Sequence, residues 1–201
     1  IHRLARQLGD LFEGQQLGVS SPQGRFAAGA ALVDGRVLTS ARAHCKHLYL
    51  DFTAPEEPSD VLVLRSHLGI YGAWSFAGDE TFAAASSIGA PRRVGERETG
   101  SAEADAVTYD DAGRVVPEAP VGAVRARLVG EHGWADLRGP ALCTVETPEE
   151  ARAAEAKLGP DPLDPQADPE PFLAAAGRSR RAVGVLLMEQ DVVSGIGNIF
   201  R

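Results

Sequence analysis

The chain has 201 residues, of which 44% are apolar and 24% charged, a balance typical of a folded globular protein and not of a disordered one. The formal net charge of −8 excludes a surface that is basic all over, although one basic face could still bind nucleic acid. No apolar run is long enough to cross a bilayer, and Cys45 and Cys143 lack the spacing of metal ligands. We therefore expect a protein of the reducing bacterial cytosol, with no membrane partner and no metal site within these residues.

The first half of the chain changes from a helical to a β pattern. Apolar residues at positions 1, 4, 5 and 8 predict an amphipathic helix that ends at Gly9. Short runs rich in β-branched and aromatic residues follow, with turn signals such as Asp34-Gly35 between them. Strands are predicted at 16–20, 30–33, 37–41, 46–52, 61–66 and 123–129. Many short strands separated in this way favour a sandwich or a barrel-like sheet.

The second half is irregular at first and then helical. Residues 77–120 are polar and acidic and predict a long inserted loop with one hairpin. Thr147 followed by Pro148 is a typical helix start, and we expect that helix to run to about Lys157. Prolines between 159 and 165 predict a stiff linker, and helical stretches are expected from 168 and over 180–190. We therefore predict an α+β protein with a β-rich domain at 1–146 and a helical domain at 147–201.

The last sixteen residues predict an anion site. They contain the end of a helix, a turn at Gly195-Ile196-Gly197, and the start of a further helix at Asn198. Glycines allow backbone N–H groups to turn toward an anion, and a helix N-terminus adds positive partial charge. The same glycine pattern is also typical of a plain helix C-cap.

This segment resembles the helix-two-turns-helix motif of the formamidopyrimidine-DNA glycosylase and endonuclease VIII family. Matching motifs occur in the family's order and spacing at 2–5, 21–26, 46–48, 67–72, 135–140 and 158–163. The chain is identified as a member of the endonuclease VIII-like branch over nearly its whole length, except the insertion at 77–120. The resemblance implies a β-sandwich catalytic domain and a partial helix-two-turns-helix domain. It implies a bifunctional base-excision-repair enzyme, a glycosylase that flips out and removes an oxidised base and an AP lyase that nicks the strand.

The resemblance also implies catalytic parts outside these residues. The family's nucleophile is an N-terminal proline followed by glutamate, and in relatives both precede the helix that begins near His2. The family's zinc finger, with one structural zinc, follows the helix-two-turns-helix domain. Because the chain starts at Ile1 and ends one turn into a helix, we expect an internal piece of a longer protein that does not perform the chemistry by itself.

Two groups of residues match the family's contacts to the DNA backbone. Lys46 matches the hairpin lysine that contacts the phosphate near the lesion and assists proton transfer, although an isolated strand-edge lysine is more often only solvated. Asn198 matches a phosphate ligand that acts with the amides of Gly195 and Gly197, and it could also be an N-cap. Cys45 stands where relatives carry glycine. Further phosphate contacts, or solvated side chains, are expected at Lys157, Arg180 and Arg181.

A flipped base leaves a hole in the duplex that relatives fill with wedge residues. Ile70 and Tyr71 occupy the matching loop, where the alternative is ordinary core packing. Arg138 aligns with an arginine that enters the opposing strand in the purine-specific branch. Gly184 stands where that branch has a lysine near the damaged base, which favours oxidised pyrimidines as substrates.

Three hypotheses about the function remain open at this point. The first is release of oxidised pyrimidines from double-stranded DNA that contains oxidised bases or abasic sites, by a monomeric enzyme. The second is release of oxidised purines, and the third is damaged-DNA binding without catalysis. The histidines are expected to be strand and turn residues and not metal ligands, since no carboxylate or cysteine cluster accompanies them in sequence: His44, His47 and His132.

Overall fold

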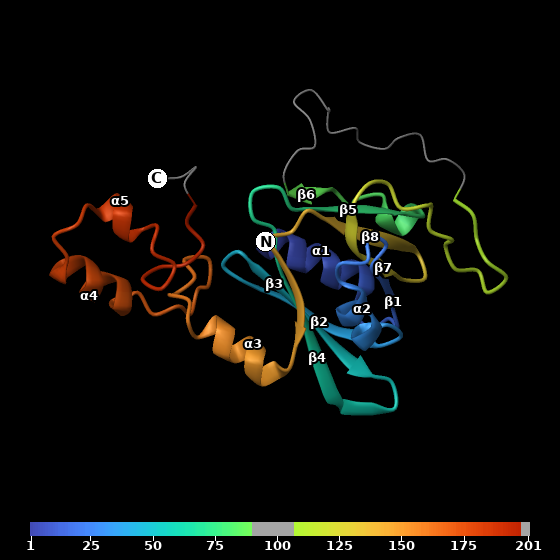
Figure 1. Ribbon diagram of the computed structural model, residues 1–201, viewed down its shortest axis with the longest axis horizontal. Coiled ribbons are helices and arrows are strands. Elements are labelled where there is room, and N and C mark those ends of the chain that lie inside the picture. The colour runs from blue at the N-terminus through green and yellow to red at the C-terminus, as the bar shows by residue number, and fades with distance from the viewer. Residues whose placement is uncertain (90–106, 198–201) are drawn as a thin grey trace, which may run out of the picture.

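Two antiparallel sheets form one end of the molecule and helices form the other (Figure 1). The computed structural model describes residues 1–89 and 107–197. The helices are α1 (His2–Phe12), α2 (Ala27–Val33), α3 (Pro148–Glu155), α4 (Glu170–Arg178) and α5 (Val183–Leu186), with a 3-10 turn η1 (Glu80–Phe82). The strands are β1 (Gly18–Ser20), β2 (Val37–His44), β3 (His47–Ala54), β4 (Glu57–His67), β5 (Ala73–Gly78), β6 (Ile88–Gly89), β7 (Val124–Val129), β8 (Gly133–Arg138) and β9 (Leu142–Glu146).

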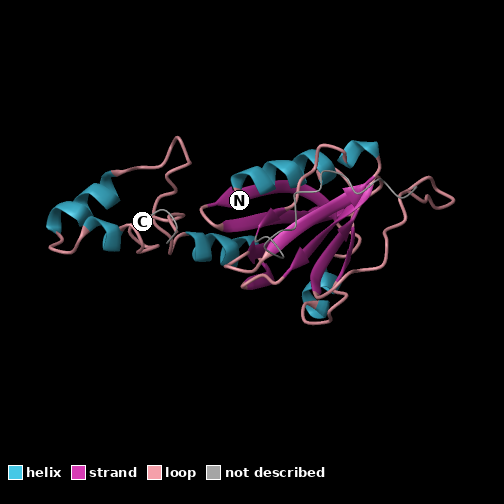
Figure 2. Cartoon of the chain, turned by 90° about the horizontal axis from the view of Figure 1, so that it is seen from above, coloured by secondary structure: helices cyan, strands magenta, loops and turns pink. Residues whose placement is uncertain are grey.

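The predicted α+β class with a β-sandwich is confirmed. One sheet has the strand order β1-β7-β8-β5-β6 and the other β2-β3-β4-β9. A single core joins them, because Phe52 and Leu64 of one sheet and Trp74 and Leu128 of the other are all 0% exposed and belong to one cluster. Figure 2 shows the helix at the N-terminus lying along one side of the strands. Burial of these large side chains is the main stabilising contribution to this half of the chain.

Helix α1 is longer than its sequence pattern predicted. Gly9 lies inside the helix, which continues to Phe12. Phe12 extends the apolar stripe of Leu4 and Leu8, is 1% exposed, and packs edge-on against Phe82 with ring centroids 5.5 Å apart. Burial of this aromatic ring outweighs the helix penalty of glycine, which is about 1 kcal/mol.

One predicted strand is helical, and four strands, β5, β6, β8 and β9, were not predicted. Residues 30–33 were predicted as a strand but form the end of α2, because the alanines before them are strong helix formers and Ala30 and Val33 share a buried face. Strand β8 was missed because it carries a charged residue, Asp136. That carboxylate is 2% exposed and receives two hydrogen bonds from Arg127 of β7, which allows the strand to lie inside the sheet. The predicted strands near β2, β3, β4 and β7 are confirmed with shifted ends.

The predicted loop at 77–120 contains more structure than expected. The end of β5, η1 and β6 all lie within it, and residues 90–106 lie outside the described part. The expected hairpin is present at Tyr109 and Val115, which form an isolated β-bridge. Its turn is held by Asp110, whose carboxylate accepts hydrogen bonds from the backbone of Ala112 and Arg114.

The helical end begins as predicted and then departs from the pattern. Thr147 and Glu150 form a complete capping box at the start of α3, which ends at Glu155 and not near Lys157. The third helical stretch was predicted over 180–190, yet α5 has only four residues and turns follow it.

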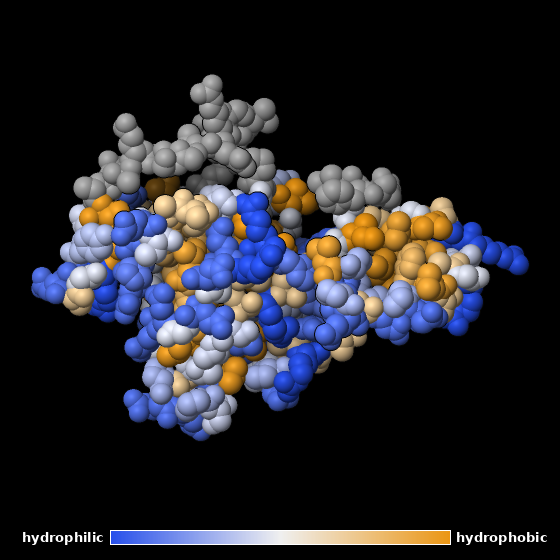
Figure 3. Space-filling view, turned by 180° about the vertical axis from the view of Figure 1, so that it is seen from behind, coloured by the Kyte–Doolittle hydropathy of each residue, from blue (hydrophilic) through white to orange (hydrophobic). Residues whose placement is uncertain are grey.

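No residue of α4 is buried, and hydrophobic residues gather on the surface of this end (Figure 3). Among the described residues, no helix is long and apolar enough to span a membrane.

Candidate nucleic-acid interface

The tip of the β2–β3 hairpin carries Lys46. His44 pairs with His47, so Cys45 and Lys46 form a two-residue turn. Cys45 adopts a left-handed conformation with φ 56°. Two-residue hairpin turns favour glycine at this first position, and a Cβ there costs about 1–2 kcal/mol. The left-handed backbone is the physical reason that glycine suits this position in relatives, and the chain tolerates cysteine there.

Lys46 contacts the glycine turn at the other end of the molecule. Its Nζ donates a hydrogen bond to the carbonyl of Ile196 at 2.6 Å, and the side-chain oxygen of Gln190 lies at 3.4 Å. A Cβ on Gly197 would lie 3.6 Å from the same Nζ, an ordinary van der Waals distance, so Gly197 also lies beside the lysine. Burial lowers the pKa of Lys46 below its ordinary value. An ammonium has three N–H donors, so a third remains for an anion.

Gln190 organises the turn that Lys46 contacts. Its amide nitrogen donates to the carbonyls of Met188 and Ile196, and its oxygen accepts the N–H of Gly195 at 3.2 Å. The N–H of Gly195 is therefore occupied inside the protein, and this glycine supplies the left-handed backbone with φ 91°. Sequence reasoning did not select Gln190 as a site residue, although it lies within the family motif. Asn198, which was predicted as the phosphate ligand, lies outside the described residues.

Asp161 joins three segments that are far apart in sequence. The carboxylate is 2% exposed and accepts hydrogen bonds from the Cys45 N–H at 2.5 Å, the Leu163 N–H at 2.9 Å and the His2 ring at 2.7 Å. Burial alone would raise the pKa of this carboxyl, but the N–H donors of Leu163 and Cys45 outweigh it and lower the pKa. Sequence reasoning missed Asp161 and His2, although both lie in motifs that it used.

The linker around Asp161 also carries the glycine turn. Gly159 donates its N–H to the carbonyl of Gln190 at 2.7 Å, and Ser194 donates to the carbonyl of Pro160 at 3.0 Å. A Cβ on Gly159 would lie 2.7 Å from the backbone of Val192, so only glycine fits this close crossing. The linker therefore fixes the glycine turn against the Lys46 hairpin.

The loop between β4 and β5 projects two large side chains into solvent. Ile70 is 80% exposed and Tyr71 is 81% exposed, which excludes the core-packing alternative for both. The base of the loop is fixed, since Gly69 has φ 65° and a Cβ on Gly72 would lie 2.3 Å from the carbonyl of Leu68. Two exposed apolar side chains on a fixed loop are what a wedge requires.

Arg138 lies beside this loop but is bound to the protein. A Cβ on the next residue, Gly139, would lie 2.9 Å from the Tyr71 carbonyl, so the two turns are in contact. The guanidinium donates to Asp136, to the Ser75 hydroxyl and to the Val121 carbonyl. The structure therefore places Arg138 near the wedge loop with its donors directed into the sheet.

The remaining predicted cations lie on the helical end. Lys157 follows α3 and is exposed, as is Arg180. Arg181 forms an ion pair with Glu189. Contacts between described residues link none of these three to Lys46, so the structure brings together only part of the predicted set.

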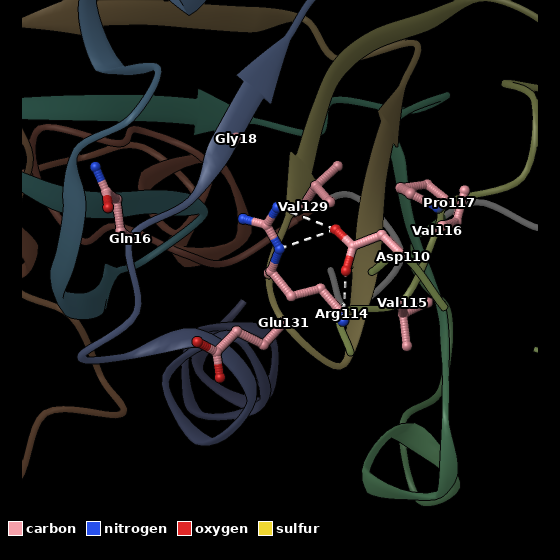
Figure 4. A pocket seen from close by; sticks show the side chains of 10 residues that line it. Gln16, Gly18, Asp110, Arg114, Val115, Val116, Pro117, Val129 and Glu131 are labelled. Carbon is pink, nitrogen blue, oxygen red and sulfur yellow. Dashed lines mark hydrogen bonds and ion pairs between the residues drawn. The ribbon is translucent and has the colours of Figure 1, made fainter. Parts of the chain in front are cut away.

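One pocket lies away from this arrangement, and one histidine pair lies beside it. The described residues form an open pocket of about 460 Å³ between β1 and the 109–115 hairpin, lined in part by the Asp110–Arg114 ion pair (Figure 4). None of the predicted site residues lines it. His47 and His67 stack with centroids 4.9 Å apart, and burial, followed by the neighbouring His67, lowers the pKa of His47 to about 4.

Comparison with known proteins decides the family. No protein-family model matches the chain. The chain is 36% identical over 204 residues to "Endonuclease 8 1" of Mycobacterium tuberculosis and of Mycobacterium bovis, a match that covers 100% of this chain and 61% of the relative. The chain belongs to the formamidopyrimidine-DNA glycosylase/endonuclease VIII family. It spans about three fifths of the length of these endonuclease 8 relatives.

Solved structures of this glycosylase family share the fold. The Lactococcus lactis formamidopyrimidine-DNA glycosylase, in a complex with DNA that contains an abasic site, matches with a TM-score of 0.64 at 16% identity over 98% of this chain and 61% of that chain. MutM in complex with DNA containing carbocyclic 8-oxo-G matches with a TM-score of 0.65 at 16% identity over 98% of this chain and 63% of that chain. A shorter match, 42% identical over 55 residues, covers 27% of this chain and 20% of the formamidopyrimidine-DNA glycosylase of Shewanella denitrificans.

Proposed function

We propose that the chain carries the lesion-recognition part of a base-excision-repair DNA glycosylase with AP lyase activity, which removes oxidised pyrimidines from duplex DNA. The observation that carries this proposal is the contact of Lys46 Nζ with the Ile196 carbonyl in the glycine turn. That contact brings together a cation and a turn from segments 150 residues apart in the sequence. The whole-chain similarity to endonuclease 8 relatives supports the same function.

Lys46 and the turn are proposed to hold the phosphate beside the damaged nucleotide. The lysine contributes its third N–H, and its positive charge attracts the phosphodiester. Gly197 and Asn198 would add backbone and amide donors on the same side, while Gly195 shapes the turn. Lys157, Arg180 and Arg181 are proposed as weaker contacts along the backbone. The overall charge of −8 makes such a local basic site the main electrostatic attraction for DNA.

Ile70 and Tyr71 are proposed to enter the duplex when the damaged base leaves it. Insertion of apolar side chains replaces part of the stacking energy lost on flipping. An isoleucine–tyrosine pair at the tip resembles the leucine–tyrosine pair of endonuclease VIII, and it lacks the methionine of the purine branch. Arg138 is proposed to stay with the sheet until DNA displaces its hydrogen bonds. These features favour oxidised pyrimidines over oxidised purines.

The reaction requires an amine that the family supplies from a proline ahead of α1. In the proposed reaction the amine attacks C1′ of the sugar, the base departs and is protonated, and the resulting iminium allows elimination of the 3′ phosphate. His2 is bound to Asp161, and Asp161 also binds the N–H next to Lys46. This chain of contacts would place a residue ahead of α1 close to the phosphate site. The zinc finger expected from the family would lie outside residues 1–201.

The test uses the longer protein that contains this chain. Duplexes with thymine glycol, with 8-oxoguanine and with no lesion are incubated with enzyme, and base release is measured with and without borohydride. We expect faster release of the oxidised pyrimidine and a covalent adduct with borohydride, both reduced at least tenfold by Lys46→Ala. Arg36→Gln, which removes a cation paired with Asp60 on the sandwich, serves as the matched control.

Each outcome separates the alternatives. Faster release of 8-oxoguanine would replace the pyrimidine proposal with the purine one. If the protein binds damaged duplex selectively but neither releases a base nor forms the borohydride adduct, it would be a damaged-DNA-binding relative without catalysis. Equal activity of the Lys46→Ala and Arg36→Gln proteins would overturn the role given to Lys46.

A further inference from the structure

Three different metal-ligating side chains meet below the tip of the Lys46 hairpin. His44, Cys45 and Asp161 each offer a ligand atom, and these atoms all lie within 4.8 Å of one another. Cys45 is 7% exposed and Asp161 is 2% exposed. The two segments that form the cluster are 116 residues apart, which is why the sequence showed no ligand spacing. Figure 1 shows the β2–β3 hairpin pointing toward the helical end that supplies Asp161.

The two ring nitrogens of His44 have different surroundings. Its Nδ1 lies 3.8 Å from the carboxylate of Glu155, while its Nε2 is buried and has no hydrogen-bond partner among the described residues. The distance is too long for a hydrogen bond, but the negative charge favours the proton on Nδ1, which leaves a lone pair on Nε2. Buried nitrogen atoms rarely lack a partner, so we expect a ligand to bind at the unpartnered Nε2.

A second unpartnered group lies beside the cysteine. The Ser194 hydroxyl is next to the Cys45 thiol and 1% exposed, and it has no oxygen or nitrogen partner among the described residues. Asp161 binds His2 and the N–H groups of Cys45 and Leu163, and its carboxylate also lies within hydrogen-bond reach of the Cys45 thiol. His44 Nε2 therefore remains without a partner among the described residues, and the Ser194 hydroxyl has none besides the neighbouring thiol.

The cysteine occupies a backbone conformation that suits glycine better. Its φ of 56° favours a residue without Cβ, so the side chain is kept against a local preference. Burial raises the pKa of the thiol to about 11, so a neutral thiol is the resting form. The thiolate is the form that binds a metal ion, so binding must displace the thiol proton.

We propose that His44, Cys45 and Asp161 bind one zinc ion, or an ion of similar chemistry, at the junction between the sandwich and the helical end. Sulfur, imidazole and carboxylate together are the donor set that zinc prefers, whereas magnesium and calcium prefer oxygen alone. Binding forms a sulfur–metal bond and releases the thiol proton to solvent. Water or His2, whose ring lies 2.7 Å from the Asp161 carboxylate, completes four-coordination. The site goes beyond the proposed function and does not depend on it.

Cobalt titration of residues 1–201, which do not include the zinc finger expected in the longer protein, tests the site, because Co²⁺ replaces zinc and its bond to a thiolate gives a charge-transfer absorption band. We expect one equivalent of Co²⁺ to produce that band, and an equivalent of Zn²⁺ to remove it by displacement. Cys45→Gly is expected to fold, since glycine suits φ 56°, and to lose the band. Cys143→Ser, which removes the other free cysteine, is the matched control and keeps it.

A second variant tests the geometry around the histidine. Glu155→Gln leaves the three ligands in place and removes the charge that faces His44, so Co²⁺ affinity is expected to fall about 10- to 100-fold. Circular dichroism confirms that the variant is folded, since Glu155 also pairs with Arg42. Absence of the thiolate band in the unmodified protein, or an equal band in Cys45→Gly, would overturn the proposal.

Discussion

The two ends of the molecule are stabilised in different ways. In the sandwich, large side chains from both sheets are completely buried in a single core. In the helical end, α4 buries no residue, and Leu173, Val183 and Val185 are between 39% and 56% exposed. Leu186 and Val193 are buried in this end, and polar contacts made by Asp161, Gln190 and the linker backbone further position the residues after α3.

This difference shows how the proposed site is built. The sandwich provides a rigid hairpin that carries Lys46, and the polar contacts bring the glycine turn to it. Hydrogen bonds fix geometry more closely than apolar contacts do, but each contributes only about 1 kcal/mol of net stability. We therefore expect the sandwich to determine global stability and the polar contacts to determine the local order of the glycine turn.

The largest expected effect is a core truncation in the sandwich. Phe52 is 0% exposed in β3, and Phe52→Ala should lower the free energy of unfolding by about 3–5 kcal/mol, because it removes buried apolar area and leaves a cavity. Urea denaturation followed by tryptophan fluorescence measures the change. A loss below about 1 kcal/mol would contradict a single core shared by both sheets.

Removal of the Asp161 charge should have an intermediate and local effect. Asp161→Asn weakens the acceptor for the N–H groups of Cys45 and Leu163 and the ring of His2. We expect local opening at the junction to become easier by about 1–3 kcal/mol, with protection of amides in the sandwich core unchanged. Amide hydrogen exchange resolves the two regions. Equal loss of protection in both would show that they unfold as one unit.

Acidification should act on the same contact in a defined direction. Because the pKa of Asp161 is lower in the folded protein than in the unfolded chain, its stabilising contribution is complete above the unfolded value of about 3.9. The contribution is lost as pH falls through the lower folded value. The protection factor of the Cys45 amide, which corrects for intrinsic exchange, should therefore be constant above about pH 4 and fall at lower pH in the parent. Asp161→Asn should lack this acid-dependent fall, and its presence in the variant would assign it to another group.

The smallest effect is expected on the exposed face of α4. Leu173 is 53% exposed, and Leu173→Ala should change the free energy of unfolding by less than about 0.5 kcal/mol. The same urea experiment used for Phe52→Ala provides a direct comparison. A loss of 2 kcal/mol or more, on the scale of a core truncation, would show that α4 is packed in solution and would remove the contrast between the two ends.

Local sequence patterns predicted much of this fold. The capping box at Thr147 and the strands around β2, β3, β4 and β7 depend on neighbouring residues, and they were found. The missed features depend on contacts between elements and not on the residues of one element alone. Strand β8 requires Arg127 to neutralise Asp136, and α1 extends to Phe12 because Phe82 packs against it.

The site shows the same limit. Lys46, Ile70 and Tyr71 were selected through motifs, and the structure places Lys46 against the glycine turn and leaves Ile70 and Tyr71 exposed. Asp161 and Gln190 were not selected, because their importance lies in which backbone groups they bind across the junction. Spacing along a sequence does not encode such contacts, so these two residues required the structure.

The most direct test of the central proposal is the salt dependence of DNA binding. Fluorescence anisotropy with a duplex that contains an abasic-site analogue is measured over a range of salt concentrations for the parent, Lys46→Gln and Arg36→Gln. If Lys46 and the glycine turn hold a phosphate, Lys46→Gln weakens binding and reduces the slope of log K against log salt by about 1, while Arg36→Gln changes neither. Unchanged affinity and slope in Lys46→Gln would contradict a phosphate site at this junction.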